Sequence, residues 1–189
     1  MSSTFKLEYV REEAGAIITG HGTAFACDLR HWGIADGVLT AAHNVGEKGS
    51  SYPNLTLEIN GKKKGCKVLA ANPELDLAVL SCDTGIKPLK LSDEELSIGD
   101  PVVMTGLLKS NPVMLEYWGS IEGLFYQGFA RHKIAVVFDH GASGGPITKS
   151  GKVVGIAVCG IPKDGDLDRS CGLFVPTVAI KAFLGSAKR

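Results

Sequence analysis

The sequence carries no excess of charge of either sign. Its 189 residues include 20 Lys and Arg and 20 Asp and Glu, so the formal net charge is zero at pH 7. Binding to nucleic acids or to anionic membrane surfaces generally relies on a surplus of basic residues. The one basic cluster, Lys62–Lys64, follows Asn60 and Gly61 and is interpreted as a solvated hairpin. We therefore expect neither a nucleic-acid partner nor a membrane partner.

Long hydrophobic runs and a secretory leader are also missing. No run approaches the ~18 apolar residues that a membrane-spanning helix needs. The first residues, Met1–Lys6, lack the basic start and apolar core of a signal peptide. These features predict a cytoplasmic protein, and secretion stays open if a signal peptide was removed upstream of the printed sequence.

Cysteine is scarce and irregularly spaced. The five cysteines include no C-x-x-C pair, which argues against a zinc site and against a dense disulfide framework. We interpret them as small buried thiols of a reducing compartment. A single bridge between Cys159 and Cys171 is the alternative for an exported protein.

Aromatic residues make up only 7% of the chain, whereas glycine occurs 24 times. Many glycines between short apolar runs indicate an all-β protein with many turns. Leu55, Leu57 and Ile59 alternate with polar residues, as in a half-buried strand, and Asn60-Gly61 is a type I′ turn signal.

A polar segment rich in turn-forming residues predicts that the chain folds as two lobes. Residues 83–99 are rich in Asp, Gly, Pro, Ser and Glu, which favours a linker between a first lobe (1–90) and a second lobe (91–189). We expect a polar lead-in with one short strand over residues 1–12 and a polar loop over residues 161–170. A helix is predicted over Pro176–Lys188, with proline at its first position.

A serine between glycines is the most informative chemical feature. In Gly141-Ala142-Ser143-Gly144-Gly145-Pro146 the glycines free the backbone and let a substrate approach closely. Ser143 is therefore a candidate nucleophile, and an ordinary glycine-rich turn is the alternative. Because a serine is unreactive at neutral pH without a base, the chain must also supply one.

No histidine follows Ser143 in the sequence, which restricts the choice of base. The five histidines are His21, His31, His43, His132 and His140. Their positions exclude the α/β-hydrolase order of serine, acid and histidine. The subtilisin order of acid, histidine and serine would need Asp28 or Asp36 and an α/β pattern, which the sequence lacks. The order histidine, aspartate and serine remains.

His43 and Asp76 lie at the ends of apolar runs. Thr40-Ala41-Ala42-His43 closes one run, and Asp76-Leu77-Ala78-Val79-Leu80 opens another, so a rigid scaffold can hold both side chains. Taken singly, each has a plainer interpretation, a packed histidine or a strand cap. We interpret His132 and His140 as structural, with a substrate contact as the alternative for His140, and His21 and His31 as incidental.

Together, the segments around His43, Asp76 and Ser143 resemble the chymotrypsin/trypsin-like serine peptidases, most closely the bacterial and HtrA-type members, over roughly residues 14–185. The resemblance implies an all-β fold of two antiparallel six-stranded β-barrels with a C-terminal helix and a site between the barrels. It implies that Ser143 attacks a peptide carbonyl, that His43 transfers the proton, and that Asp76 orients the imidazole. The N–H groups of Gly141 and Ser143 would form an oxyanion hole. Protein or peptide substrates are implied, and no metal or cofactor is needed.

Departures from the family pattern carry further expectations. Ala142 stands where animal trypsins have an aspartate that pairs with a newly cut N-terminus, so we expect no such activation step. The resemblance assigns the wall of the S1 pocket to Val137, Phe138, His140, Val158, Cys159, Gly160 and Gly172. Val137 replaces the acidic residue of enzymes that cut after Arg or Lys, which predicts an uncharged, apolar P1 residue. The segment after Ser143 suffices for the barrel and helix, so we expect no PDZ domain in it.

Two other functions fit the same residues. One is a protease-fold binding or scaffold module without activity, and the other is an esterase that uses the same three residues. The sequence carries no signal for an oligomeric state.

Overall fold

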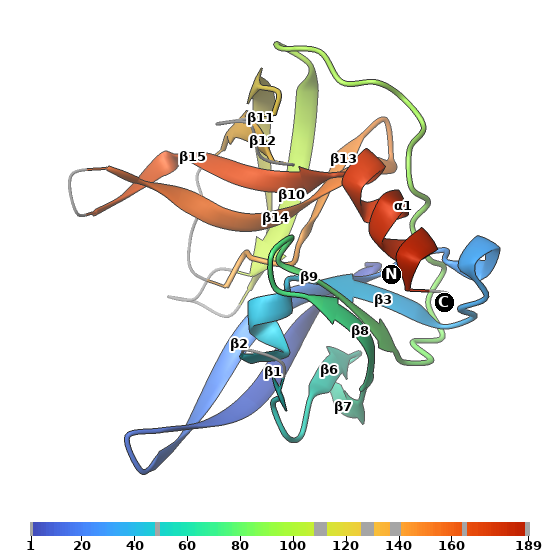
Figure 1. The fold of residues 1–189 in the computed structure, drawn as a ribbon, viewed down its shortest axis with the longest axis vertical. Coiled ribbons are helices and arrows are strands. Elements are labelled where there is room, and N and C mark those ends of the chain that lie inside the picture. Colours follow the sequence, from blue (N-terminus) through green and yellow to red (C-terminus); the bar gives the residue numbers. More distant parts are fainter. Residues whose placement is uncertain are drawn as a thin grey trace.

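The structure, a computed structural model, describes residues 2–47, 50–107, 113–125, 131–136, 141–163 and 166–187. Strands dominate it, and an α-helix, α1 (Thr177–Ser186), lies near the C-terminal end. Figure 1 shows β1–β3 and β6–β9 in one half of the molecule and β10–β15 in the other. The predicted all-β class with a C-terminal helix is confirmed.

An antiparallel sheet of seven strands, here called the first sheet, forms the first half. Its strand order is β7-β6-β1-β2-β3-β9-β8. A two-residue pair, β4 (Gly46–Glu47) and β5 (Ser50–Ser51), lies outside it. The strands of the first sheet are β1 (Thr4–Glu13), β2 (Ala16–Ala26), β3 (Gly37–Thr40), β6 (Thr56–Ile59), β7 (Lys62–Gly65), β8 (Lys67–Asn72) and β9 (Leu77–Ser81).

The first sheet has seven strands rather than six because one strand bends. β7 ends at Gly65 and β8 begins at Lys67, so only Cys66 separates them. The part before the bend pairs with β6 and the part after it pairs with β9. Counted as one bent strand, β7 and β8 curl the sheet round on itself, as a six-stranded barrel does.

A closed six-stranded barrel, here called the second barrel, forms the other half. Its strand order is β10-β11-β12-β15-β14-β13, all antiparallel. Closure leaves no exposed edge in the barrel. Its strands are β10 (Pro101–Leu107), β11 (Met114–Gly123), β12 (His132–Ala135), β13 (Pro146–Lys149), β14 (Lys152–Lys163) and β15 (Asp166–Pro176).

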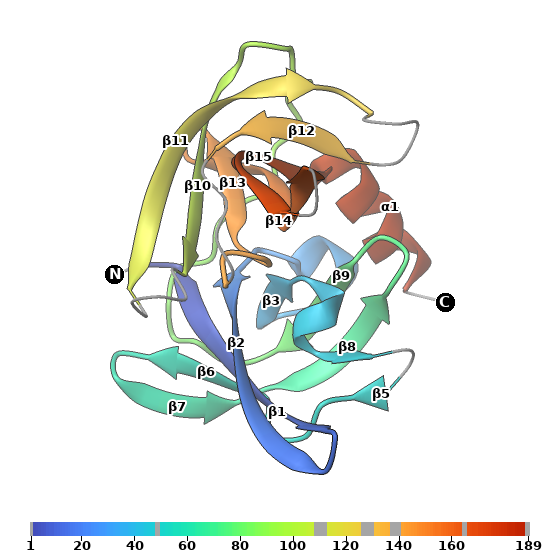
Figure 2. The ribbon, with the colours of Figure 1, turned by 90° about the vertical axis from the view of Figure 1, so that its left-hand side faces the viewer.

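Turn chemistry explains the hairpins of the first sheet. Asn60 and Gly61 both have positive φ, 50° and 73°, as a type I′ turn requires, and they join β6 to β7 as expected. Ala14 and Gly15, with φ of 52° and 80°, join β1 to β2 in the same way. Figure 2 shows the β1–β2 ribbon projecting as a long twisted hairpin.

One expectation is wrong in extent and another is wrong altogether. The short strand expected within residues 1–12 is the ten-residue strand β1, because Phe5, Leu7 and Tyr9 are buried at a spacing of two residues. The polar segment 161–170 extends β14 and β15 as a hairpin, with Ile161 paired to Asp168. There the backbone pairing, and not an apolar pattern, makes the strand.

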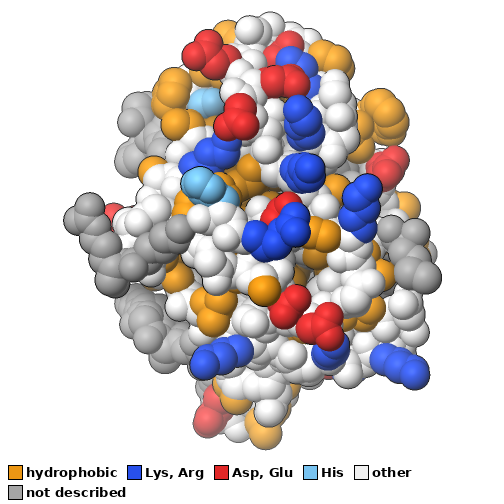
Figure 3. All heavy atoms as spheres, turned by 90° about the vertical axis from the view of Figure 1, so that its right-hand side faces the viewer, with side chains coloured by type: hydrophobic (Ala, Val, Ile, Leu, Met, Phe, Trp, Pro, Cys, Tyr) orange, Lys and Arg blue, Asp and Glu red, His pale blue; other side chains and the backbone are white. Residues whose placement is uncertain are grey.

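One core joins the first sheet, the second barrel and the helix. Phe25 and Leu39 of the first sheet pack in the same cluster as Ile156 and Val175 of the barrel and as Ile180 of α1. Figure 3 shows basic and acidic side chains interspersed on one face of the molecule, without a field of a single sign. Of the helices in the described part of the chain, none has the length and hydropathy that crossing a membrane requires.

Candidate active site

His43 and Asp76 come from the ends of two paired strands. His43 lies in η2 (Ala42–Asn44), a 3-10 turn just after β3, and Asp76 is the residue before β9. Because β3 and β9 are antiparallel neighbours, with Thr40 opposite Ala78, the end of one strand meets the start of the other. The sheet therefore brings two residues together that are 33 positions apart in the sequence.

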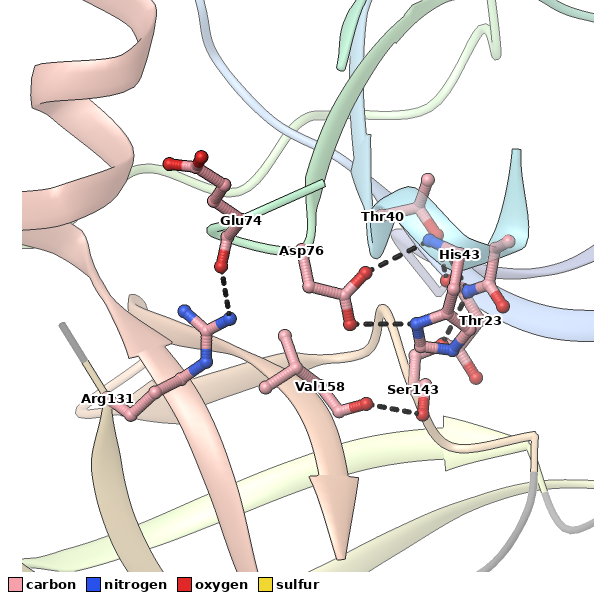
Figure 4. A network of polar contacts seen from close by, with 9 residues as sticks. Thr23, Thr40, His43, Glu74, Asp76, Arg131, Ser143 and Val158 are labelled. Carbon is pink, nitrogen blue, oxygen red and sulfur yellow. Dashed lines mark hydrogen bonds and ion pairs between the residues drawn. The ribbon is translucent and has the colours of Figure 1, made fainter. Parts of the chain in front are cut away.

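Asp76 holds His43 by two contacts. One carboxylate oxygen lies 2.7 Å from His43 Nδ1, and the other accepts the backbone N–H of His43 at 3.0 Å (Figure 4). A carboxylate only accepts hydrogen bonds, so Nδ1 carries a hydrogen and Nε2 of a neutral ring is left as an acceptor. Asp76 itself has a φ of 55°, a conformation that Asp and Asn adopt more readily than most residues.

Ser143 lies beside the His43 ring, in the loop between β12 and β13 (Figure 4). Its hydroxyl donates to the carbonyl of Val158 at 2.9 Å. Within the described residues it makes no hydrogen bond to His43. His43 and Ser143 do line the same pocket, and rotation about the Ser143 Cα–Cβ bond would redirect the hydroxyl.

A buried clamp, made by Thr23, Thr40 and Asn44 of the first sheet and η2, fixes the serine loop. Thr23 N and Asn44 Nδ2 both donate to the carbonyl of Ser143, at 3.0 and 2.9 Å. The Thr23 hydroxyl donates to the carbonyl of Gly141 at 2.6 Å. The loop that carries the serine is thereby tied to the half of the molecule that carries the histidine.

The clamp is itself closed by further hydrogen bonds. Thr40 Oγ1 donates to the carbonyl of Thr23 at 2.7 Å and accepts from Asn44 Nδ2 at 3.1 Å. The Thr23 hydroxyl also accepts from the Leu107 N–H at 2.9 Å. Thr23 and Thr40 are fully buried and Asn44 nearly so, where a satisfied network rigidifies its surroundings. Sequence reasoning missed these residues.

Close packing explains the glycine at position 144. Its φ is 89°, and a Cβ there would lie 2.1 Å from the Thr23 carbonyl oxygen. Ala142 is fully buried, with Gly106 against it. The serine loop therefore presses directly on the clamp.

The two predicted oxyanion donors lie on the same loop. Gly141 has a φ of 97°. Within the described part of the chain, neither Gly141 N–H nor Ser143 N–H donates to a protein acceptor, whereas the following Gly144 N–H bonds to the carbonyl of Ala157 at 2.7 Å.

The predicted S1 wall is described only in part. Val158 is buried in β14, and Gly160 pairs with Gly172 of β15. Val137, Phe138 and His140 lie outside the described residues, as do the side chains of Cys159 and Cys171. The S1 wall and the alternative disulfide stay predictions.

The remaining histidines with described positions make local contacts. His132 is buried between Phe125 and Phe174 and accepts the Phe125 N–H at 3.1 Å. Burial lowers the pKa of His132 and so favours its neutral form. His21 lies 3.3 Å from a Glu8 carboxylate oxygen, and His31 packs edge-on against Trp32.

A second contact missed from sequence crosses between the two halves near Asp76. Arg131 Nη2 donates to the carbonyl of Glu74 at 3.1 Å (Figure 4). Among the residues that the structure describes, no cluster of three His, Cys, Asp or Glu side chains is placed to hold a metal ion.

Comparison with known proteins places this geometry in context. The family model described as a trypsin-like peptidase domain matches residues 22–156. No curated protein matches the chain.

Several solved structures share the fold. The active form of the Rv3671c protease from M. tuberculosis has a TM-score of 0.78 and 21% identity, over 97% of this chain and 79% of that one. A serine endoprotease from Yersinia pestis has a TM-score of 0.77 and 19% identity, over 99% of this chain and 63% of that one. The HtrA-type protease AlgW, solved with a tripeptide, has a TM-score of 0.81 and 18% identity, over 99% of this chain and 60% of that one.

Proposed function

Because the chain belongs to the trypsin-like peptidases, we propose that it hydrolyses peptide bonds as a serine endopeptidase with His43, Asp76 and Ser143 as its catalytic triad. The observation that carries the proposal is the two-point contact between Asp76 and His43 beside Ser143. A carboxylate that fixes the imidazole tautomer next to a serine is the arrangement that nucleophilic acyl transfer needs.

The proposed reaction begins with a turn of the Ser143 hydroxyl from the Val158 carbonyl towards His43 Nε2. Nε2 takes the hydroxyl proton while Oγ attacks the peptide carbonyl, and the same proton then passes to the leaving amine. Asp76 stabilises the imidazolium that forms between these steps. In the second half of the reaction, His43 takes a proton from a water molecule, which attacks the acyl-enzyme. The carboxylic acid product then leaves as the proton returns to Ser143 Oγ.

The N–H groups of Gly141 and Ser143 would stabilise the oxyanion of the tetrahedral intermediate. Support comes from the clamp, which donates hydrogen bonds to the carbonyls of these same two residues and so fixes their backbone. A preorganised donor of this kind is typically worth about 2.7–4 kcal/mol in the transition state.

The acyl side of the substrate would carry an uncharged, apolar P1 residue. Val158 is apolar, and Gly160 and Gly172 face each other across β14 and β15 without side chains. A proteome-derived peptide library tests this preference, and cleavage after Arg or Lys would overturn it.

Labelling with a fluorophosphonate probe tests the nucleophile. Wild type should be labelled on Ser143, and Ser143→Ala should not be labelled. Ser150→Ala, which removes an exposed serine from the β13–β14 turn, is the matched control and should be labelled like wild type. A wild type without labelling would favour a binding module, and turnover of esters without peptides would favour an esterase.

A further inference from the structure

A pocket of about 250 Å³ opens beside Ser143 on the side of the first sheet. Its walls combine His43, Asn44 and the serine loop with residues from the β1–β2 ribbon. The described part of its lining includes neither Val158 nor Gly172 of the predicted S1 wall. Because His43 would protonate the leaving amine, a pocket lined by His43, and by neither Val158 nor Gly172, would receive the residues after the cleaved bond.

The β1–β2 ribbon contributes Tyr9, Arg11, Ile18 and Gly20 to the lining, together with Thr19 and His21. Tyr9 is paired with Gly20 and Arg11 with Ile18, and directly opposed residues in antiparallel strands share a face. Since alternate residues point the same way, all four belong to one face.

Glycines show that this face leads to the nucleophile. A Cβ at Gly20 would lie 2.2 Å from the Tyr9 ring, and one at Gly22 would lie 2.4 Å from the Asn44 amide. Gly22 is two residues from Gly20, so the Asn44 side chain covers the same face that carries Arg11 further along. Tyr9 stacks on Tyr52, with ring centroids 4.9 Å apart, and so gives the pocket a firm aromatic side.

The pocket is electropositive by composition. Arg11 is half-buried and is the only permanently charged residue among those described in the lining, which include no acid. Glu8 does not belong to the described lining; it pairs with Lys6 and Lys63, and with His21, which does line the pocket. The two lysines offset its negative charge.

We propose that this pocket selects substrates that carry a carboxylate after the cleaved bond, with Arg11 as the specificity-determining cation. The proposal rests on the proposed peptidase function. A guanidinium binds a carboxylate through two parallel N–H donors. The carboxylate has two possible sources, an acidic side chain or the free C-terminus of a short leaving segment.

Strand geometry sets the expected position of the carboxylate. Arg11 is opposite Ile18, which is five residues from Thr23, the residue bonded to the Ser143 carbonyl. At about 3.4 Å per residue, that is roughly 17 Å along the ribbon. The long arginine side chain shortens this distance when it points back towards the site. An extended substrate therefore presents its second to fourth residue after the cleaved bond to Arg11.

Quenched fluorescent peptides with one fixed acyl half test the proposal. Their leaving halves carry Glu, Gln or Lys at the second, third or fourth position and end in an amide; a second set has Gln throughout and ends in a free carboxylate. Wild type should show kcat/KM about tenfold higher for Glu than for Gln at the best position, and lowest for Lys. A preference for the free carboxylate alone would identify the C-terminus as the source.

Variants assign the preference to Arg11. Arg11→Gln should lower the Glu-to-Gln ratio of kcat/KM to about one, and Arg11→Glu should reverse the order of Glu and Lys. Arg30→Gln is the matched control, because Arg30 is exposed, pairs with Asp28 and lines a different pocket; it should keep the wild-type ratio.

The two proposals fail in different ways. If wild type is not labelled by a fluorophosphonate, which has no leaving peptide segment, the peptidase function fails. If wild type is labelled and cleaves peptides but treats Glu, Gln, Lys and the free carboxylate alike, only the carboxylate pocket is overturned. A ratio in Arg11→Gln that equals the wild-type ratio would also overturn the role of Arg11.

Discussion

At the residue scale, both the backbone conformation and the side-chain contacts of Asp76 restrict which residue can occupy this position. Its φ of 55° favours Asp or Asn, and its two carboxylate oxygens both face His43. Asp76→Asn should therefore keep the backbone but present an N–H donor that disturbs the imidazole tautomer. We expect kcat to fall about 10³- to 10⁴-fold while the free energy of unfolding stays close to that of wild type. Peptide hydrolysis measures kcat, and urea unfolding measures the free energy of unfolding. A fall in kcat of less than tenfold would contradict the role of Asp76.

Replacement of Gly144 should lower the free energy of unfolding. Gly144 and Gly151 both have positive φ, 89° and 75°. A Cβ at Gly144 would meet the Thr23 carbonyl at 2.1 Å and Thr40 Oγ1 at 2.4 Å, whereas nothing lies within 4 Å at Gly151. Gly151→Ala should cost about 1 kcal/mol from backbone strain alone, and Gly144→Ala at least about 2 kcal/mol more from overpacking. Equal losses in the free energy of unfolding for Gly144→Ala and Gly151→Ala would show that the clamp shifts to make room for the added methyl group.

At the scale of elements, the sequence predicts best where a pattern is local. The β6–β7 hairpin follows from Asn60-Gly61 and alternating apolar residues. The length of the strand over Thr4–Glu13 was underestimated because its charged residues obscure the alternation of Phe5, Leu7 and Tyr9. The β14–β15 extension over 161–170 was missed because its register depends on backbone pairing between polar segments.

The same limit applies to the candidate site. His43, Asp76 and Ser143 stand in recognisable local segments. The clamp does not, because Thr23 contacts Gly141 across 118 positions and a threonine in a strand resembles any other β-forming residue. Arg11 was hidden for the same reason, since only the ribbon register places it on the face that leads to Ser143.

Helix α1 should matter for stability through its buried side. Ile180 and Leu184 are buried in the shared core, whereas Val178 is 62% exposed. Leu184→Ala should lower the free energy of unfolding by about 2–5 kcal/mol through the cavity it leaves. Val178→Ala, an apolar truncation on the same helix, should change it by at most about 0.5 kcal/mol. Urea titrations of both variants provide the measurement, and similar losses would mean that the helix does not dock as described.

At the scale of the whole molecule, the segment predicted as a linker is held to both halves. Leu89 N donates to the carbonyl of Ala26, and Asp28 N donates to the carbonyl of Leu89. On the other side, Ser92 N donates to the carbonyl of Val153. The connection is therefore bonded to both halves around Leu89–Ser92, and the shared apolar cluster lies between the same two halves.

This continuity predicts that the first sheet and the second barrel unfold together. A polar linker over 83–99 would let each half open at its own urea concentration, whereas a shared core makes the loss of one half expose the apolar face of the other. Hydrogen exchange with mass spectrometry, at increasing urea, reads peptides from β1–β3 and from β13–β15 separately. The two sets should lose protection at one common midpoint, and Leu184→Ala should lower both midpoints equally. Two midpoints, or a shift confined to the barrel peptides, would show that the halves unfold independently in spite of the clamp and the shared core.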